Sequence, residues 1–200
     1  MRNLPEPLRE VMDDLRRLGF GPKAALRAAL QLLKWPEGET RRMGEAIGGL
    51  RSRLLPCGRC GALTEHDPCA ICRDPSRDAS FLCVVAEWDS LLNLEQGGFY
   101  RGHYLILGGL LSPQDNMRPE QLRLERLEQR LTEGGVAEVI LGLGATLEAE
   151  NTASYLKERL EDKFPALRIS RLAQGMPLGA EVKFMDSETL RQSMKYRQAL

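Results

Sequence analysis

Apolar residues recur at helical spacing through the first quarter of the chain. A first helix is predicted over residues 6–18, where one side carries Leu8, Val11, Met12, Leu15 and Leu18. A second helix is predicted over residues 22–33, with Pro22 suited to its first turn. A third is predicted over residues 40–54. The pattern therefore predicts a helical N-terminal region.

Beyond residue 80 the pattern changes to short apolar runs that alternate with amphipathic segments. Continuous apolar runs of this length are typical of buried strands, and they predict strands at 81–85, 104–107, 138–142 and 167–170. Helices are predicted between them, at 88–96, 120–133 and 152–164. Strands that alternate with helices indicate a largely parallel sheet with helices on both faces.

The end of the chain follows a third pattern. A glycine-containing loop at 174–181 leads to residues 182–186, which are predicted to form a β-hairpin or strand that makes subunit contacts. A final helical piece is predicted to end at Leu200.

Four of the chain's five cysteines lie within sixteen residues, as two Cys-x-x-Cys pairs made of Cys57, Cys60, Cys69 and Cys72. Each pair aims two thiolates at one point, and four thiolates are the ligand set of a structural zinc site. The alternative is two disulfides, which need an oxidising compartment. His66 is predicted to lie at the surface and Cys83 in the core. We expect one structural zinc ion per chain, because four thiolates leave no position open for water.

Composition and charge limit the functional class. The chain begins without an apolar signal segment, and no run reaches the length of a membrane span. We therefore expect a cytoplasmic protein without a membrane partner, whose thiols stay reduced. The net charge is zero, but residues 1–55 hold 11 Lys and Arg against 7 Asp and Glu, whereas residues 78–200 hold 14 against 18. The N-terminal part is the better candidate for phosphate contact.

The first two predicted helices are joined by a Gly-x-Gly turn, Gly19 to Gly21, which is the form of a helix-hairpin-helix motif. Glycine lets the backbone approach a phosphate closely, and the N–H groups at the start of the next helix hold the anion. Lys23 and Arg27, one helical turn apart, add charge on the same face. An ordinary helical hairpin with a glycine turn carries equal weight from the pattern alone.

Several short stretches stand in a fixed order along nearly the whole chain. They are Gly-Phe-Gly-Pro-Lys at 19–23, the four-cysteine cluster, Arg-Asp-Pro-Ser-Arg-Asp at 73–78, Leu-Cys-Val-Val at 82–85, Tyr-Arg-Gly-His-Tyr at 100–104, Leu-Gly-Gly-Leu-Leu-Ser-Pro at 107–113, Thr-Leu-Glu at 146–148 and Gly-Met-Pro-Leu-Gly-Ala-Glu at 175–181. In this order they resemble the RecR family of bacterial recombination mediators, which act in DNA repair.

The resemblance implies a Toprim-like sheet and no catalytic activity. It implies that the protein acts with RecO, and in some settings RecF, to load recombinase onto single-stranded DNA at gaps and at junctions with duplex. Members of the family assemble as rings, typically tetramers, through their N-terminal hairpins and C-terminal segments. Lys23 and Arg27 fall where the family has basic residues implicated in DNA contact, and a nucleoid-associated location follows.

The fold class predicted from these patterns is mixed α/β, in four segments. A helix-hairpin-helix domain occupies residues 1–54 and the four-cysteine zinc motif residues 55–77. The Toprim-like domain is predicted for residues 78–172, and the C-terminal assembly segment for residues 173–200.

The chain departs from the family's pattern where Toprim enzymes carry their acids. The usual pair of glutamates is Ala86 and Glu87, and the Asp that normally follows is Ser90, with Asp89 beside it. Asp115 stands where a working enzyme presents paired aspartates. Glu87 and Asp115 are thus candidates for a partner contact or a weak magnesium site, and solvated surface acids are the alternative.

Three functional hypotheses follow from the sequence. The first is a non-enzymatic DNA-binding mediator that uses the hairpin around Gly19. The second is a metal-dependent Toprim nuclease or primase-like enzyme that uses Glu87 and Asp115. The third is a protein-interaction adaptor that has lost DNA binding.

Overall fold

The structure is a computed structural model that describes residues 4–197 of the 200-residue chain. It divides between Leu54 and Leu55 into two compact units, each of which is described by itself. The predicted division into four segments, at 54/55, 77/78 and 172/173, stays a prediction. Among residues 4–197, no helix combines the length and the apolar character that a membrane crossing requires.

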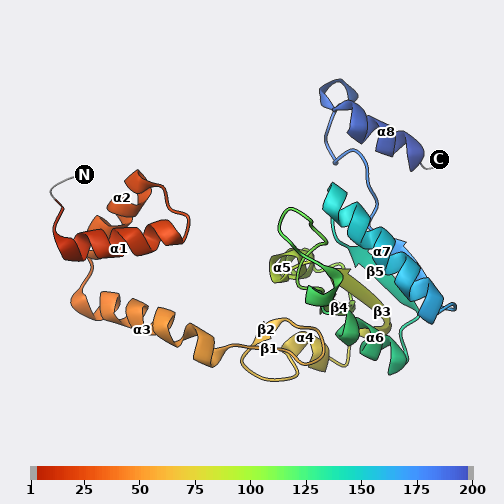
Figure 1. Cartoon of the computed structure of the whole chain (residues 1–200), viewed down its shortest axis with the longest axis horizontal. Helices are drawn as coiled ribbons and strands as arrows, with labels where there is room; N and C mark the ends of the chain where they lie inside the picture. Colours follow the sequence, from red (N-terminus) through yellow and green to blue (C-terminus); the bar gives the residue numbers. More distant parts are fainter. Residues whose placement is uncertain (1–3, 198–200) are drawn as a thin grey trace. The chain divides into compact units, whose positions relative to one another are not determined.

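The N-terminal unit holds three helices, α1 (Glu6–Arg17), α2 (Pro22–Leu32) and α3 (Glu37–Arg53) (Figure 1). The first two form a hairpin whose small core is Met12 against Ala25 and Ala29. Two alanines at this contact let the helices approach closely. The third helix begins three residues before its predicted start at residue 40, directly after Pro36, and buries none of its own residues.

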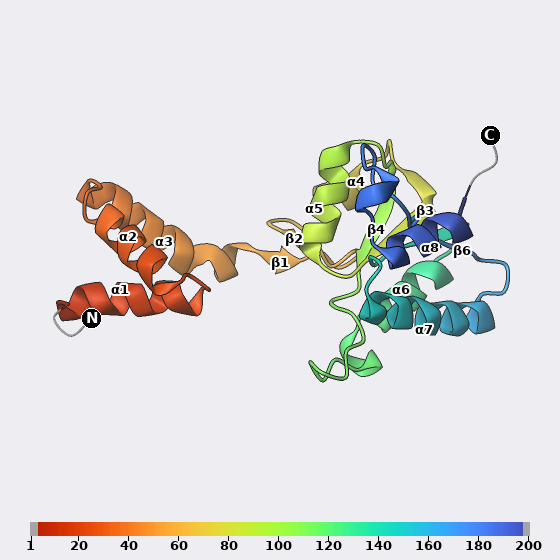
Figure 2. The same ribbon diagram turned by 90° about the horizontal axis from the view of Figure 1, so that it is seen from above.

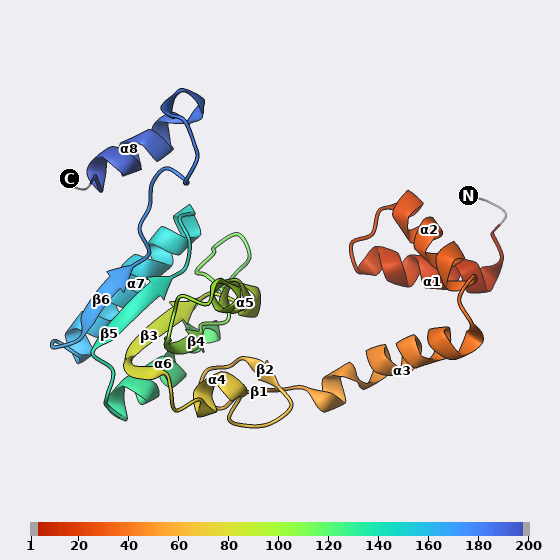
Figure 3. The same ribbon diagram turned by 180° about the vertical axis from the view of Figure 1, so that it is seen from behind.

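The second unit is built on four parallel strands in the order β4-β3-β5-β6, three of which are seen from above in Figure 2 and all four of which are labelled in Figure 3. Their bounds are β3 (Asp78–Val85), β4 (Gly102–Ile106), β5 (Glu138–Gly142) and β6 (Arg168–Arg171). In the register, Val84 lies between Leu105 of β4 and Leu141 of β5. The parallel sheet confirms the mixed α/β prediction.

Alternate residues of the strands point to opposite faces, and each face has its own cover (Figure 3). Leucines of α6 (Leu124–Thr132) and α7 (Leu147–Lys163) pack on one face, against Val84 and Leu105. The other face carries Leu91 of α5 (Trp88–Gly97) and the four clustered cysteines. These cysteines lie among β1 (Leu55–Pro56), β2 (Leu63–Thr64) and α4 (Ala70–Arg73).

In the second unit, the starts of α6 and α7 also differ from the predictions, each for a physical reason. The helix predicted at 120–133 is interrupted, because the Arg123 amide donates to the Leu107 carbonyl (2.8 Å) instead of a helical partner. A 3-10 turn, η1 (Pro119–Gln121), therefore precedes α6. In contrast, α7 begins before the predicted residue 152, because the Thr146 hydroxyl accepts from the Ala149 amide (3.2 Å) and caps the helix.

The C-terminal prediction was wrong in one respect. Residues 182–186 form neither a hairpin nor a strand but a 3-10 turn, η2 (Val182–Phe184), followed by α8 (Ser187–Lys195). A strand needs a neighbour to satisfy its backbone groups, and the Asp186 carboxylate instead accepts from the Thr189 amide (2.9 Å) and starts a helix. The predicted end of that helix at Leu200 lies outside the described residues.

A half-buried ion pair ties the linker before β3 to the rest of the second unit. The Arg77 guanidinium donates to both carboxylate oxygens of Glu95 in α5 (3.0 and 2.5 Å) and to the Gly102 carbonyl of β4 (3.1 Å). Burial raises the pKa of Glu95, but the hydrogen bonds and charge of Arg77, together with Tyr104, outweigh burial and hold that pKa below its ordinary value. These bonds therefore fix the position of the linker, which joins the cysteine segment to β3, relative to α5 and β4.

Candidate metal centre and nucleic-acid interface

The four paired cysteines converge on one point. Their sulfur atoms lie within 4.8 Å of one another, and all four residues are buried. A tetrahedral zinc ion with bonds of about 2.3 Å requires sulfur atoms about 3.8 Å apart, and the Cys60 and Cys69 sulfurs lie 3.6 Å apart. All five cysteines are free thiols, so the disulfide alternative is not realised. The chain therefore presents a closed four-thiolate site that fits a structural zinc ion.

Backbone hydrogen bonds shape the first Cys-x-x-Cys turn. The Cys57 amide donates to the Ala62 carbonyl (2.7 Å) and the Gly61 amide to the Cys57 carbonyl (2.9 Å). Gly61 has a φ of +81°, in the left-handed region where glycine is favoured. The Asp67 carboxylate accepts from the Gly58 amide (2.8 Å) and so links the first turn to the segment that carries the second.

Two amides also donate directly to ligand sulfurs. The Ala62 amide reaches the Cys60 sulfur and the Cys69 amide the Cys57 sulfur, each at 3.4 Å. Such bonds stabilise negative charge on sulfur, which is the form that binds metal.

The thiols cannot all ionise without a cation. A hydrogen bond from the Cys72 thiol outweighs burial and lowers the pKa of Cys60 to about 5. Burial raises the pKa of Cys69 to about 11, and the hydrogen bond to Cys60 raises the pKa of Cys72. One thiolate is thus favoured at the expense of its neighbours, and a zinc ion supplies the charge that lets all four ionise.

The two other residues considered as ligands lie elsewhere. His66 is exposed and does not belong to the cluster. Cys83 is buried within β3, and burial raises the pKa of its thiol to about 12.

The glycine turn of the N-terminal hairpin exposes its basic residues. Gly19 has a φ of +96°, and Gly21 is the residue that precedes the first turn of α2. No side chain caps the amides at the start of α2, and Lys23 and Arg27 are both exposed one turn apart. The structure thus brings the four residues Gly19, Gly21, Lys23 and Arg27 together at one end of the hairpin.

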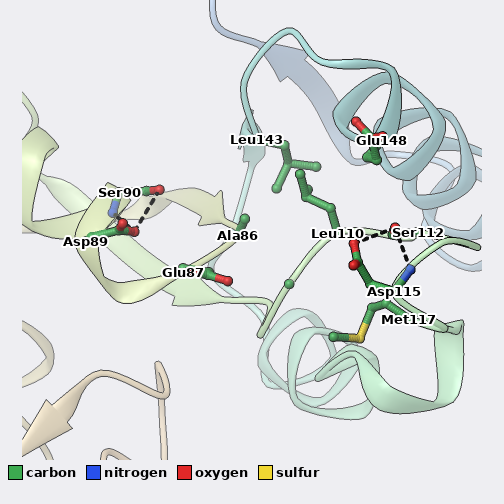
Figure 4. Close-up of a pocket in the computed structure, with 11 residues that line it drawn as sticks. Ala86, Glu87, Asp89, Ser90, Leu110, Ser112, Asp115, Met117, Leu143 and Glu148 are labelled. Atoms are coloured by element: carbon green, nitrogen blue, oxygen red, sulfur yellow. Dashed lines mark hydrogen bonds between the residues drawn. The ribbon is translucent and has the colours of Figure 1, made fainter. Parts of the chain in front are cut away.

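The Toprim acids line an open pocket of about 500 Å³ beside the ends of β3 and β5. Figure 4 shows Glu87 and Asp115 on different sides of this pocket, with apolar side chains such as Leu143 also lining it. Asp115 accepts a hydrogen bond from the Ser112 hydroxyl (2.8 Å). Glu148, in the first turn of α7, lines the same pocket and was not assigned to a site from the sequence.

These acids do not form a metal cluster. Among the residues that the structure describes, the four cysteines are the only group of three or more that brings potential ligand atoms together for a metal ion. Asp89 accepts from the Ser90 amide (2.6 Å) next to it.

Two further residues contact the cysteine segment and were not predicted. Arg123 and Arg126, at the start of α6, donate to backbone carbonyls of the first Cys-x-x-Cys turn. No local sequence signal marks them, because the contact spans more than sixty residues of chain.

Replacement of one zinc ligand tests the structural role of the metal. We expect Cys72→Ala to lose zinc and to lower the stability of the second unit by about 2–5 kcal/mol, as removal of a covalent staple does. Zinc content and urea unfolding measure both effects. The matched control is Cys83→Ala, a buried cysteine outside the cluster, which should keep one zinc per chain. A Cys72→Ala protein with unchanged unfolding would contradict the structural role.

Comparison with known proteins identifies each part of the second unit. A family model described as the Toprim domain matches residues 80–173. The model of the RecR four-cysteine zinc finger domain matches residues 55–74, and that of the RecR C-terminal region matches residues 175–198.

Similarity to curated proteins extends over the full length. The Recombination protein RecR of Nitratidesulfovibrio vulgaris is 60% identical over 201 residues, covering 100% of both chains. That of Maridesulfovibrio salexigens is 54% identical with the same coverage. That of Moorella thermoacetica is 43% identical over 98% of both chains. The chain therefore belongs to the RecR family of recombination proteins, with a Toprim domain and a structural four-cysteine zinc finger.

Proposed function

We propose that this chain is a non-enzymatic, DNA-binding recombination mediator. It acts with RecO, and in some settings RecF, to load recombinase on single-stranded DNA at gaps and junctions with duplex. The observation that carries the proposal is the exposed pair Lys23 and Arg27 beside the glycine turn of the N-terminal hairpin.

The hairpin suits the phosphate backbone rather than the bases. Uncapped amides at the start of α2 and two flexible cations offer charge and hydrogen-bond donors, which phosphate oxygens accept. Such contacts carry little sequence information and release counterions. We therefore propose DNA binding that depends weakly on sequence and steeply on salt concentration.

The geometry of the Toprim pocket supports a binding role over catalysis. A metal-dependent nuclease needs several carboxylates around one ion, and in this pocket Ala86 occupies one of the acid positions. Glu87, Asp115 and Glu148 instead leave an open, acidic surface. We assign this surface to a partner protein with a basic segment, with RecO as the candidate and a weak magnesium ion as the alternative.

Self-association is supported by α3. This helix buries none of its residues but carries Met43, Ile47 and Leu50 at helical spacing, and Ile47 and Leu50 are 64% and 58% exposed. An apolar stripe on a helix is stable in water only when it is covered. We propose that a second copy of the chain covers it, as one contact of a ring, with a tetramer as the expected form.

The glycines of α3 support the same assignment. Gly44 and Gly48 lie next to the apolar stripe, and a Cβ atom at either would meet nothing within 4 Å. Each glycine costs a helix about 1 kcal/mol relative to alanine, and no close contact within the described chain requires glycine at these two positions. Small residues allow another helix to approach closely.

The proposed site of action follows from the metal and the DNA. Thiolates that hold zinc persist in a reducing compartment, and chromosomal DNA is the substrate of recombination. We therefore place the protein in the cytoplasm, associated with the nucleoid.

A double substitution tests the DNA site. We expect Lys23→Ala/Arg27→Ala to abolish the gel shift of gapped duplex DNA, because each hydrogen bond to a charged group contributes about 1.5–3 kcal/mol. The salt dependence of any residual binding should fall by about two phosphate contacts. Circular dichroism should show an intact fold.

The control for net charge is Lys157→Ala/Arg168→Ala, which removes two exposed cations (61% and 76%) from the other unit. This variant should bind gapped DNA as the unmodified protein does. Equal binding by both double variants would refute the assignment of the DNA site to the hairpin.

A charge on α3 tests self-association separately. We expect Ile47→Glu to shift the mass measured by light scattering toward smaller assemblies, because the interface would bury an unpaired carboxylate. Leu147→Glu, at an exposed leucine of the second unit (72%), is the control and should assemble normally. An unchanged mass for Ile47→Glu would exclude α3 from the subunit contacts.

A further inference from the structure

Two arginines at the start of α6 hold the first Cys-x-x-Cys turn. The Arg126 Nη1 atom donates to the Cys57 carbonyl at 3.2 Å. The Arg123 Nη1 atom donates to the Gly61 carbonyl at 3.3 Å and lies 3.5 Å from the Ile106 carbonyl of β4. Both side chains therefore join α6 to the backbone that carries the zinc ligands.

The guanidinium groups approach that backbone so closely that a side chain at Gly61 would displace them. A Cβ atom at Gly61 would lie 2.5 Å from Arg123 Nη1 and 3.0 Å from Arg126 Nη1. The left-handed φ of Gly61 is a second reason for glycine. The guanidinium groups of both arginines thus lie beside Gly61, while they donate to two different peptides of the metal-binding turn.

The contact of Arg123 reaches a zinc ligand through a single peptide group. The carbonyl of Gly61 and the amide of Ala62 belong to the same peptide bond. The carbonyl accepts from Arg123, and the amide donates to the Cys60 sulfur at 3.4 Å. Hydrogen bonds at the two ends of a peptide polarise one another, so the cation strengthens the N–H···S bond.

The contact of Arg126 differs in this respect. It reaches the Cys57 carbonyl, and the amide of the same peptide, that of Gly58, donates to the Asp67 carboxylate instead of a sulfur. Arg126 therefore holds the turn in place without a direct path to a ligand sulfur.

Electrostatics gives both arginines a further role. Four thiolates around one Zn²⁺ carry a net charge of about −2, and a buried charge is unfavourable unless it is compensated. In the described part of the chain, the hydrogen bonds of the Arg123 and Arg126 guanidinium groups go to carbonyls and none goes to a carboxylate. Their charges are thus available to balance the zinc site. Arg59 and Arg130, by contrast, face Glu133 at 4.0 and 3.6 Å.

We propose that Arg123 and Arg126 are positioning residues of the zinc site. Arg123 stabilises Cys60 as a ligand through the Gly61–Ala62 peptide, and both cations balance the charge of the site. The retention of zinc in this chain thereby depends on α6 of the Toprim domain as well as on the four cysteines.

Zinc release from the full-length protein tests the proposal. Transfer of zinc to the chelating dye 4-(2-pyridylazo)resorcinol should be about 10-fold faster or more in Arg123→Gln and in Arg126→Gln, the range for loss of an outer partner of a metal ligand. The matched control is Arg59→Gln, which removes one positive charge from an exposed position between Cys57 and Cys60. This variant should release zinc at the rate of the unmodified protein.

Cobalt substitution separates the two arginines. A weaker N–H···S bond leaves the thiolate a stronger donor, so the sulfur-to-cobalt charge-transfer band of Co²⁺-loaded Arg123→Gln should move to longer wavelength. The band of Arg126→Gln should stay in place, because its peptide does not reach a sulfur. A merely structural role for Arg123 would speed metal loss without moving the band.

Each outcome decides the question. Fast zinc release with a shifted band in Arg123→Gln supports the proposal, and Arg123→Lys, which keeps the charge, should release zinc more slowly than Arg123→Gln. If Arg123→Gln does not fold, Arg126→Gln carries the test, and a zinc-release rate for Arg126→Gln equal to that of Arg59→Gln overturns the proposal. The same holds if Arg123→Gln and Arg59→Gln release zinc equally fast.

Discussion

The structure of the second unit depends on the need of four buried thiols for a divalent cation. Without one, ionisation of Cys60 suppresses ionisation of its neighbours. The Cys60 carbonyl of the metal-binding turn accepts from the Ile106 amide of β4 at 2.8 Å, so the turn that holds the metal is bonded to the sheet. Because β4 is an edge strand, this bond covers backbone that would otherwise be open to pairing with other chains. The metal site therefore completes the sheet.

The strand β4 that the zinc finger covers also leads to the pocket lined by Glu87, Asp115 and Glu148. The loop that follows β4 carries Asp115. On the other side, Arg77 fixes the linker from the cysteines to α5 and β4. The zinc finger and the sheet are thus one folded unit, whereas the basic hairpin belongs to a separate unit. The proposed partner contact and the proposed DNA contact therefore lie in different units of the chain.

Local patterns predicted most of this fold, and the failures came from long-range contacts and from local helix caps. The spacing of Cys57 to Cys72 was sufficient to predict the zinc site, and apolar runs predicted the four strands. The start of α6 was missed because Arg123 bonds to Leu107, and no periodicity records that bond. Glu148 was missed as a pocket residue because the apolar pattern predicted a helix only from residue 152. In the structure α7 begins at Leu147, which places Glu148 in its first turn beside the pocket. The contacts of the Arg123 and Arg126 side chains with the zinc finger were also missed, because they join residues more than sixty positions apart.

We infer that zinc stabilises the edge strand β4 as well as its own turn. Hydrogen exchange of the full-length protein with and without a zinc chelator measures this directly. Zinc removal should expose the amides of both Gly61 and Ile106 to exchange, while amides of β5, which lies inside the sheet, stay protected. Loss of protection at Gly61 alone, with Ile106 unchanged, would show that zinc stabilises only its own turn.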